Sequence, residues 1–566
     1  MFKKILIANR GEIAARIIAS AQEMGIETVA IYSDVDEDSV QVHAADFSYP
    51  LGDPTPSKSY LNMKKIINIA LESGSEAIHP GYGFLSENAE FAKKVIKAGL
   101  VWIGPSPDAL RAVGDKIQAK RSMRAAGIPV IPGYHKGSRS KKILLEKAQE
   151  IGYPLMIKAT AGGGGKGMRI VESEKNFISA YKSAQREAKS AFGVGDVFLE
   201  KYFPHIRHIE FQILGDHYGN IIHLNERECS IQRRHQKIIE ETPSVALEKD
   251  SSLREKMGEV AIQAAKSVNY TNAGSVEFIL DVEENNFYFL EINARLQVEH
   301  AITEATTGVD LVKWQIKIAA GQELTLKQED VIGRGHALEF RIYAENPENQ
   351  FMPTAGKIHQ VEIPVGVNIR NDLGITSGRE VSTYYDPMIA KLIVHAENRE
   401  EAIQKMKWAL RNYAALGIPT NINFLKEVLN HEDFLSGNTH TDFVTHHFNK
   451  WSGGPKETPY EVLLAAALFE VMEPFMSTGS EVSSLKAING IDINSPWQKF
   501  GTWGRESLDV ISDKITGTFG KGKAAIRKII PAKEDMHSSF LPDSDPFSPW
   551  RKIGSWELGK KQNRKY

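Results

Sequence analysis

The stretch from Phe287 to His300 constrains the fold of this chain more than any other segment. It starts with apolar and aromatic residues and then alternates, so that Glu291, Asn293 and Arg295 share one side of a predicted strand. Unpaired charges are costly to bury, so this side must face either solvent or a site that uses the charges. Both interpretations, a solvated surface strand and a functional site, are open from the stretch alone.

The residue types in this stretch suit a metal ion beside an anionic substrate. Glu291 and Asn293 offer oxygen ligands of the kind that Mg²⁺ prefers. Arg295 can hold an oxyanion through two parallel hydrogen bonds. Glu299 follows as a further carboxylate, placed where a general base can act.

A second carboxylate is expected on a neighbouring strand. Residues 271–279 predict a strand that contains Glu277, and the polar turn at 283–286 connects it to the strand that carries Glu291. A short turn joins antiparallel neighbours, so the two glutamates can bracket two metal ions. A pair of carboxylates beside Asn293 and Arg295 is more specific than a pair alone.

Length and composition restrict the class of protein. A chain of 566 residues is too long for one compact core, so three or four domains are expected. A net charge of −2 gives no overall field that favours nucleic acid or membrane, and we expect neither as a partner. Cys229 is the single cysteine, which excludes an intrachain disulfide and favours a cytoplasmic location. Residues 1–8 predict a first strand rather than an export signal.

The first 113 residues alternate strand and helix patterns. The predicted elements are strands at 3–8, 27–32, 77–78 and 101–104, and helices at 13–24, 60–73 and 88–98. This order predicts a doubly wound parallel sheet. Only Gly11 lies in the first turn, so the glycine fingerprint of a dinucleotide site is absent. The segments 79–83 and 86–88 can line a site or serve only as loops.

A glycine-rich unit follows the helix predicted at 115–126. Strands at 154–159 and 168–171 flank four consecutive glycines, which predicts a mobile hairpin loop. Glycine lets backbone N–H groups approach a phosphate, and Lys158 and Lys166 add positive charge. No Ser or Thr follows the lysine and a strand comes next, so this is not a P-loop. We interpret it as a phosphate lid, and an ordinary flexible hairpin is the alternative.

Two further segments carry candidate ligands. The predicted strand at 197–203 runs into a hinge-like segment, where Glu200 and the nearby backbone can read an adenine edge. A basic run at 232–237 follows a strand predicted at 221–225, and its cations favour an anionic ligand. A solvated basic loop is the alternative for that run.

These residues together resemble the biotin carboxylases, which have the ATP-grasp fold. The resemblance covers residues 1 to about 445 and is carried by the glycine loop and by the stretches 7–14, 79–88, 229–237 and 295–300. The form Arg-Leu-Gln-Val-Glu-His at 295–300 looks closer to the α subunits of acyl-CoA carboxylases than to the shortest biotin carboxylases. Ala294, Ala301 and Phe340 depart from the usual family residues, but none removes a polar group with an assigned role.

The resemblance implies binding sites for ATP, for two Mg²⁺ ions (with Mn²⁺ as an alternative) and for bicarbonate. The implied ATP contacts are Lys116, Lys158, Gly164, Gly165, Glu200, Lys201, Phe203, His208, Gln232, His235, Glu277 and Glu291. The implied metal ligands are Glu277, Glu291 and Asn293. Bicarbonate is expected at Lys237, Arg295 and the backbone N–H groups near Gln297 and Val298.

The implied reaction is the ATP-dependent carboxylation of biotin. Glu299 deprotonates bicarbonate, which attacks the γ-phosphate of ATP to give carboxyphosphate. Carboxyphosphate breaks down to CO₂ and phosphate, the phosphate takes the N1 proton of biotin, and the ureido enolate attacks CO₂. Arg341 stabilises that enolate. The alternative for Arg341 is a structural arginine paired with Glu339 or Glu345.

The expected architecture is α/β and α+β with several domains. We predict an N-terminal α/β domain at 1–113, an ATP-grasp domain at 114–330 with its mobile glycine-rich lid at about 130–203, a mixed C-terminal biotin carboxylase domain at 331–446, and an extension of uncertain structure at 447–566. The Met-Lys-Met signature of a biotinyl domain is absent, and Met406-Lys407 lies inside a helical pattern at 401–410. Biotin is therefore expected on a separate chain.

Three functions fit these observations. The first is the biotin carboxylase of an acyl-CoA carboxylase, an ATP-dependent ligase working with a biotin carboxyl carrier protein and a carboxyltransferase subunit and forming a homodimer. The second is the biotin carboxylase subunit of a split pyruvate carboxylase. The third is a catalytically silent scaffold, against which the presence of Lys237, Arg295, Glu299 and Arg341 argues.

Overall fold

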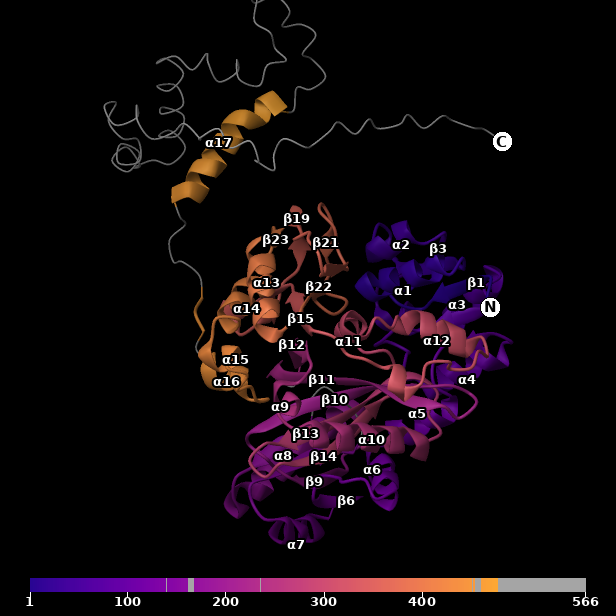
Figure 1. Cartoon of the computed structure of the whole chain (residues 1–566), viewed down its shortest axis with the longest axis vertical. Helices are drawn as coiled ribbons and strands as arrows, with labels where there is room; N and C mark the ends of the chain where they lie inside the picture. Colours follow the sequence, from indigo (N-terminus) through magenta and orange to yellow (C-terminus); the bar gives the residue numbers. More distant parts are fainter. Residues whose placement is uncertain (139, 161–166, 235, 450, 454–459, 477–566) are drawn as a thin grey trace, which may run out of the picture. The chain divides into compact units, whose positions relative to one another are not determined.

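The computed structural model describes residues 1–138, 140–160, 167–234, 236–449, 451–453 and 460–476 (Figure 1). It divides into two compact units, Met1–Gly454 and Pro455–Tyr566. Gly164, Gly165 and His235, expected to contact ATP, lie outside the described residues, as does most of the extension after 447.

The N-terminal sheet is parallel, with the strand order β3-β2-β1-β4-β5. Its strands are β1 (Lys4–Ile7), β2 (Glu27–Ser33), β3 (Phe47–Gly52), β4 (Ala77–His79) and β5 (Val101–Trp102). Ile5 and Ile7 pack in the same core cluster as α1 (Gly11–Glu23), whereas Leu6 packs with α3 (Met63–Glu72) and α4 (Ala89–Lys97) on the other face. The predicted doubly wound sheet is confirmed.

Strand β3 was not among the predicted elements. It contains Pro50 and lies at the edge of the sheet, where most of its side chains are exposed. An edge strand tolerates proline and needs no buried apolar row, so its residues give a weak pattern.

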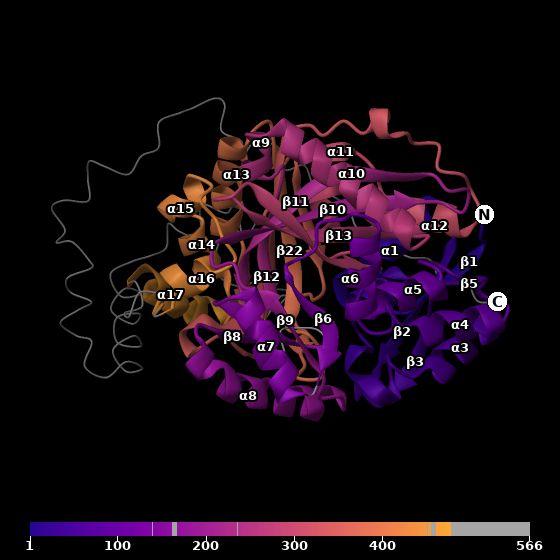
Figure 2. The ribbon, with the colours of Figure 1, turned by 90° about the horizontal axis from the view of Figure 1, so that it is seen from below.

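The lid is a separate four-stranded sheet in the order β6-β9-β7-β8. Its elements are β6 (Gly133–Ser138), α7 (Lys141–Ile151), β7 (Leu155–Ala159), β8 (Arg169–Val171), α8 (Glu174–Phe192) and β9 (Val197–Lys201). Strands β7 and β8 pair antiparallel, which confirms the predicted hairpin on either side of the glycine run. Helices α7 and α8 lie together over this sheet (Figure 2) and enclose its small apolar core.

An eight-stranded antiparallel sheet carries most of the polar residues singled out in the sequence. Its strands in spatial order are β14 (Asn286–Asn293), β13 (Asn272–Asp281), β10 (Ile206–Gly215), β11 (Ile221–Arg233), β12 (Gln236–Thr242), β15 (His336–Tyr343), β22 (Met388–Ala396) and β20 (Ile369–Leu373). Helix α10 (Ser251–Ser267) packs along β10 and β11, and α13 (Arg399–Arg411) packs on β15 and β22 (Figures 1 and 2).

The sequence pattern ended one of these strands too early. The strand predicted at 221–225 continues to Arg233, and the basic run forms the hairpin between β11 and β12. The continuation contains Glu226, Arg227 and Glu228, which do not look like buried strand residues. Each is paired with an opposite charge in the fold, and this pairing offsets part of the cost of removing the charge from water.

The remaining elements are short strand pairs and helices. The pairs are β16 (Glu345–Asn346) with β17 (Met352–Pro353), β18 (Gly356–Lys357) with β21 (Glu380–Val381), and β19 (Gln360–Glu362) with β23 (Ala414–Leu416). The helices are α2 (Val40–Ala44), α5 (Pro107–Gly114), α6 (Lys116–Ala125), α9 (Val245–Glu248), α11 (His300–Thr307), α12 (Leu311–Ala319), α14 (Ile422–Val428), α15 (Glu432–Leu435), α16 (Phe443–His447) and α17 (Tyr460–Met476). Met406 and Lys407 lie inside α13, as predicted.

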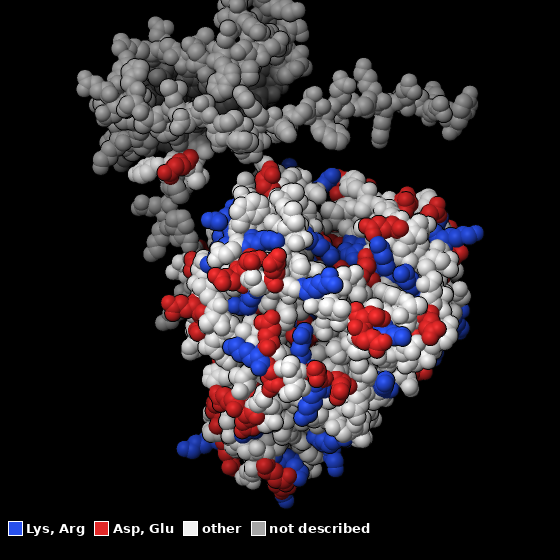
Figure 3. Space-filling model, in the orientation of Figure 1, with Lys and Arg blue, Asp and Glu red and all other residues white. Residues whose placement is uncertain are grey.

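The surface shows no large region of one charge on the face drawn in Figure 3, where acidic and basic side chains of the described residues are interspersed. Among the described residues, no helix combines the length and apolar composition that crossing a membrane requires.

Candidate active site

The hairpin of β13 and β14 places two carboxylates directly opposite each other. Glu277 and Glu291 are register partners, beside a bulge at Phe278, which confirms the predicted pairing. Glu291 Oε2 lies 2.9 Å from Lys116 Nζ at the start of α6. Glu277 Oε2 lies 3.0 Å from His208 Nε2 on β10, so each carboxylate has its own cationic or polar neighbour.

Asn293 lies two residues after Glu291 on the same strand, and its side chain is poorly satisfied by the protein. Its Nδ2 is buried without a hydrogen-bond partner, and its Oδ1 receives only a long contact of 3.4 Å from Arg295 Nη2. Glu277, Glu291 and Asn293 thus lie on the paired strands β13 and β14, and the oxygen of Asn293 keeps lone-pair capacity. This donor set fits Mg²⁺, which takes hard oxygen ligands.

Glu299 is a fully buried carboxylate at the N-terminal end of α11. Its Oε1 lies 2.7 Å from Lys237 Nζ, and its Oε2 accepts a 2.9 Å hydrogen bond from Arg341 Nη2. Burial alone would raise the pKa of Glu299, but the charges of Lys237, Arg341 and Arg227 outweigh it and hold the pKa well below its usual range. Glu299 is therefore ionised.

Lys237 connects Glu299 to Glu277, one of the two paired carboxylates. Its Nζ lies 2.7–2.9 Å from carboxylate oxygens of Glu299, Glu277 and Glu210. Burial would lower the pKa of Lys237, but the surrounding acidic groups raise it well above its ordinary value. The β11–β12 hairpin holds this lysine opposite Gln232, at the inner end of the basic run.

Arg341 on β15 is buried, and its partners come from other elements. Its Nη2 lies 2.6 Å from Glu240 Oε1 and 2.9 Å from Glu299 Oε2. Glu345, one of the structural partners considered from sequence, binds Arg233 instead at 2.7 Å. Burial raises the pKa of Glu240 to about 7 against the opposing charge of Arg341. The guanidinium therefore belongs to the same polar cluster as the base.

Arg295 and the loop before α11 form the other wall of the site. Arg295 Nη1 donates to Gln297 Oε1 at 2.8 Å, and its Nε lies 3.2 Å from Glu87 Oε2. This ion pair brings the 86–88 segment, undecided from sequence, to the site. The carbonyl of Val298 accepts a 2.7 Å hydrogen bond from the buried ammonium of Lys391.

The residues expected around the nucleotide lie at the junction of lid and large sheet. Glu200 is fully buried, and its carboxylate contacts Lys120, His135 at 2.8 Å and Lys158 at 2.7 Å. The N–H groups of Lys201 and Tyr202 donate to the carbonyls of residues 132 and 154. The carboxylate of Glu200, which we expect to contact the adenine edge, is thus paired with basic side chains in this structure.

Two other predicted nucleotide contacts have identifiable neighbours. The ring of Phe203 stacks on Tyr288 of β14, with centroids 5.2 Å apart, which links the hinge to the hairpin of Glu277 and Glu291. Gln232 Nε2 lies 2.6 Å from His208 Nδ1, which fixes the imidazole that contacts Glu277.

Several polar residues of this cluster were missed by sequence reasoning. Glu210 and Gln212 alternate with His208 along β10, and both bind the buried Arg227 on β11, at 2.6 and 2.7 Å. The period-two spacing of these polar residues was the available signal, because a polar row in a buried strand requires partners. Glu240 and Lys120 carried no comparable pattern.

Comparisons with known proteins agree with this geometry. The matching domain families are "Biotin carboxylase, N-terminal domain" at residues 1–110, "Carbamoyl-phosphate synthase L chain, ATP binding domain" at 115–327 and "Biotin carboxylase C-terminal domain" at 339–446. The biotin carboxylase domain of Hydrogenobacter thermophilus 2-oxoglutarate carboxylase, solved as a dimer with MgADP, ADP and bicarbonate, is 45% identical with a TM-score of 0.78, covering 80% of this chain and 100% of that one.

Two curated relatives differ in how much of their length is matched. The mitochondrial methylcrotonoyl-CoA carboxylase subunit alpha of Rattus norvegicus is 51% identical over 78% of this chain, but this chain covers only 62% of that relative. The biotin carboxylase of Halalkalibacterium halodurans is 49% identical over 80% of this chain and 99% of its own length. Since that relative is matched almost end to end and the biotin carboxylase domain models match residues 1–110 and 339–446, the chain belongs to the biotin carboxylase family.

Proposed function

We propose that this chain is an ATP-dependent ligase that carboxylates biotin on a separate carrier protein, through carboxyphosphate, within an acyl-CoA carboxylase. The observation that carries this proposal is the single buried cluster in which Glu299, Lys237 and Arg341 adjoin the paired carboxylates Glu277 and Glu291. One end of the cluster suits a metal-bound phosphate and the other suits a small anion, which are the two reactants of the first step.

The first step uses the ionised Glu299 as the base. Bicarbonate between Lys237 and Arg295 would place its hydroxyl beside Glu299, and the two cations lower the pKa of that hydroxyl. Glu277, Glu291 and Asn293 would hold Mg²⁺, which neutralises charge on the transferring phosphoryl group. Lys116, beside Glu291, adds a further positive charge on the nucleotide side. Proton removal and phosphoryl transfer are thereby placed next to each other.

The second step needs a cation at the biotin enolate. Arg341 is held by Glu240 and Glu299, so its guanidinium is fixed before substrate arrives. A fixed donor stabilises developing negative charge without reorganisation in the transition state. The phosphate released from carboxyphosphate takes the N1 proton of biotin, and the enolate then attacks CO₂.

The names of the relatives support a proposal for the acceptor and the partners. The name methylcrotonoyl-CoA carboxylase subunit alpha supports an acyl-CoA as final acceptor, with a carboxyltransferase subunit and a biotin carboxyl carrier protein as partners. The solved dimer of the 2-oxoglutarate carboxylase domain supports a homodimer. That same relative favours a second candidate, the biotin carboxylase subunit of a split carboxylase for a 2-oxo acid such as pyruvate.

The test is bicarbonate-dependent ATP hydrolysis with free biotin. We expect biotin to stimulate phosphate release and Glu299→Gln to abolish the stimulation while the variant still binds ATP. A folded wild-type chain that binds ATP but never turns it over would favour the scaffold. Isolation of the partner transferase, followed by carboxylation assays with acyl-CoA esters and with pyruvate, separates the two acceptor classes.

A further inference from the structure

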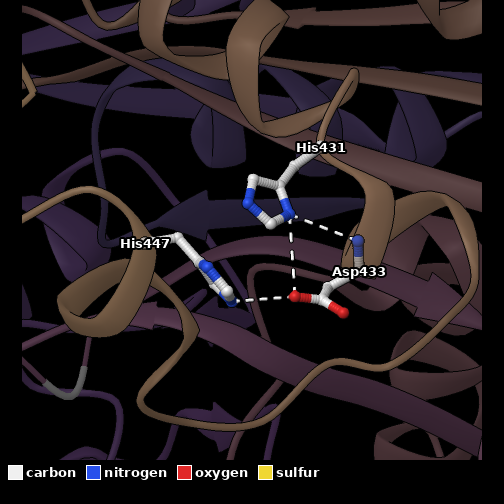
Figure 4. Close-up of side chains that lie close together, drawn as sticks. All are labelled: His431, Asp433 and His447. Carbon is white, nitrogen blue, oxygen red and sulfur yellow. Dashed lines mark hydrogen bonds and ion pairs between the residues drawn. The ribbon is translucent and has the colours of Figure 1, made fainter.

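A group of histidines on the surface of the first unit lies outside the proposed active site. His431 and Asp433 lie at the start of α15, and His447 is the last residue of α16 (Figure 4). The side chains of these three residues are 22–34% exposed. They are accessible to solvent but ordered by the helices that carry them.

The three side chains turn toward one oxygen. Asp433 Oδ2 lies 3.1 Å from His447 Nε2 and 3.9 Å from His431 Nδ1 (Figure 4). The ligand atoms of the trio all lie within 4.8 Å of one another. Two ligands bound to one zinc ion at about 2.1 Å in tetrahedral geometry are about 3.4 Å apart, so small rotations would bring these atoms into a coordination sphere.

The hydrogen bonding of His431 turns its ring toward Asp433. The backbone N–H of Asp433 donates to His431 Nδ1 at 3.2 Å. The carboxylate Oδ2 of Asp433 lies 3.9 Å from the same nitrogen. A metal ion at Nδ1 would take the lone pair that now accepts this long N–H contact, and Asp433 Oδ2 would be the adjacent ligand.

Further ligands lie beside the trio. Asp433 and His447 line a hollow of about 200 Å³ together with His205, His440, Asp442 and His446. The ring of His446 is 4.7 Å from that of His447, and His205 Nδ1 lies 3.7 Å from Asp442 Oδ2. Imidazole and carboxylate donors without thiolate suit a borderline divalent ion such as Zn²⁺.

We propose that His431, Asp433 and His447 form a binding site for a divalent transition-metal ion of the Zn²⁺ class, with a fourth ligand from the hollow or from water. The ion would join α15 to α16. This region is already tied to the large sheet, since the N–H of Thr441 donates to the carbonyl of Ile206 and Arg207 Nη2 donates to that of Gly437 at 2.6 Å. The ion would therefore act as a local structural cross-link, separate from the Mg²⁺ ligands.

The test is calorimetric titration of the tag-free full chain with Zn²⁺ in excess Mg²⁺, and the variants below separate this site from the Glu277–Glu291 pair. We expect one Zn²⁺ per chain with a micromolar or tighter Kd, weakened at least tenfold in His447→Ala and His431→Ala. Asp433→Asn, which keeps the side-chain shape, guards against misfolding and should weaken binding similarly. His43→Ala is the matched control, because His43 contacts Asp38 at 2.7 Å on the surface in a histidine–aspartate pair whose further partner is Arg379.

Substitution with Co²⁺ gives a second measurement. Visible absorption of bound Co²⁺ that disappears in His447→Ala would support nitrogen ligation at this site. Binding of neither ion, or binding that the three variants leave unchanged, would overturn the proposal. Thermal melting in EDTA verifies that each variant folds. Zn²⁺ should raise the melting temperature of the wild type but not that of the three variants.

Discussion

Lys391 offers a sharp test of how the fold supports the bicarbonate site. Its buried ammonium donates to the carbonyl of Val298 at 2.7 Å and lies 3.3 Å from Asp372 and 3.7 Å from Glu12. Lys391→Met keeps most of the side-chain volume but removes the charge. Glu12 can relieve part of the loss by protonation, because burial already raises its pKa to about 7 against the charge of Lys391.

The size of the effect follows from what the change leaves behind. Breaking a buried ion pair costs about 3–5 kcal/mol, and Asp372 keeps Arg370 as a partner at 2.8 Å, so we expect about 3 kcal/mol. Freed from Lys391, the Val298 peptide would lose its fixed orientation toward bicarbonate. If about 1.4 kcal/mol of this 3 kcal/mol is lost from the free energy of bicarbonate binding, the KM for bicarbonate rises about tenfold.

The assay compares Lys391→Met with a matched variant. Lys405 also donates its Nζ to a backbone carbonyl, that of His395 at 2.6 Å, but far from the cluster of Glu299. We expect biotin-stimulated ATP hydrolysis by Lys391→Met to need about ten times more bicarbonate, with kcat within about twofold, whereas Lys405→Met keeps the wild-type KM. An unchanged KM in Lys391→Met, or an equal rise in Lys405→Met, would show that Lys391 has only a structural role.

Three other variants test separate parts of the cluster. Burial raises the pKa of Glu240 in the folded state to about 7, above its unfolded value. Its contribution to stability is therefore present below about pH 4.5 and is lost as the pH rises through about 7. Glu240→Gln should remove this part of the pH dependence of the melting temperature. Glu277→Gln should raise the Mg²⁺ concentration needed for half-maximal ATP hydrolysis about tenfold or more, while Glu283→Gln in the exposed turn should not. Arg341→Met should lower biotin-stimulated turnover at least a hundredfold and leave biotin-independent ATP hydrolysis within a few-fold of wild type, measured by phosphate release.

Local patterns were enough to predict the hairpin that carries Glu277 and Glu291. Glu277 and Glu291 lie on strands joined by a short turn, so alternation and turn chemistry together determine that they are neighbours. The partners of Arg341 could not be found in this way. Its contact with Glu240 depends on the pairing of β15 with β12, strands about a hundred residues apart in the sequence, and no local pattern encodes that register.

Buried charges were the main source of error for the same reason. Arg227 is fully buried in a strand that the pattern ended too early, because its partner Glu210 is on another strand. The link from His447 to His431 and Asp433 likewise shows no ligand spacing in the sequence, because only the packing of two short helices, α15 and α16, brings them together. The burial of a charged residue in a strand can be predicted only when its oppositely charged partner is known.

The position of Lys237 explains why Glu277 and Glu299 belong to one cluster. One ammonium group contacts three carboxylates, so its charge is shared among Glu210, Glu277 and Glu299. A divalent cation held by Glu277 would take over the neutralisation of that carboxylate and leave more of the lysine charge for bicarbonate and for Glu299. Arg227 and Arg341 keep Glu210 and Glu299 compensated meanwhile. Nucleotide–metal binding and bicarbonate binding are therefore expected to be cooperative, and in Glu210→Gln, which removes one competitor for Lys237, that cooperativity should weaken.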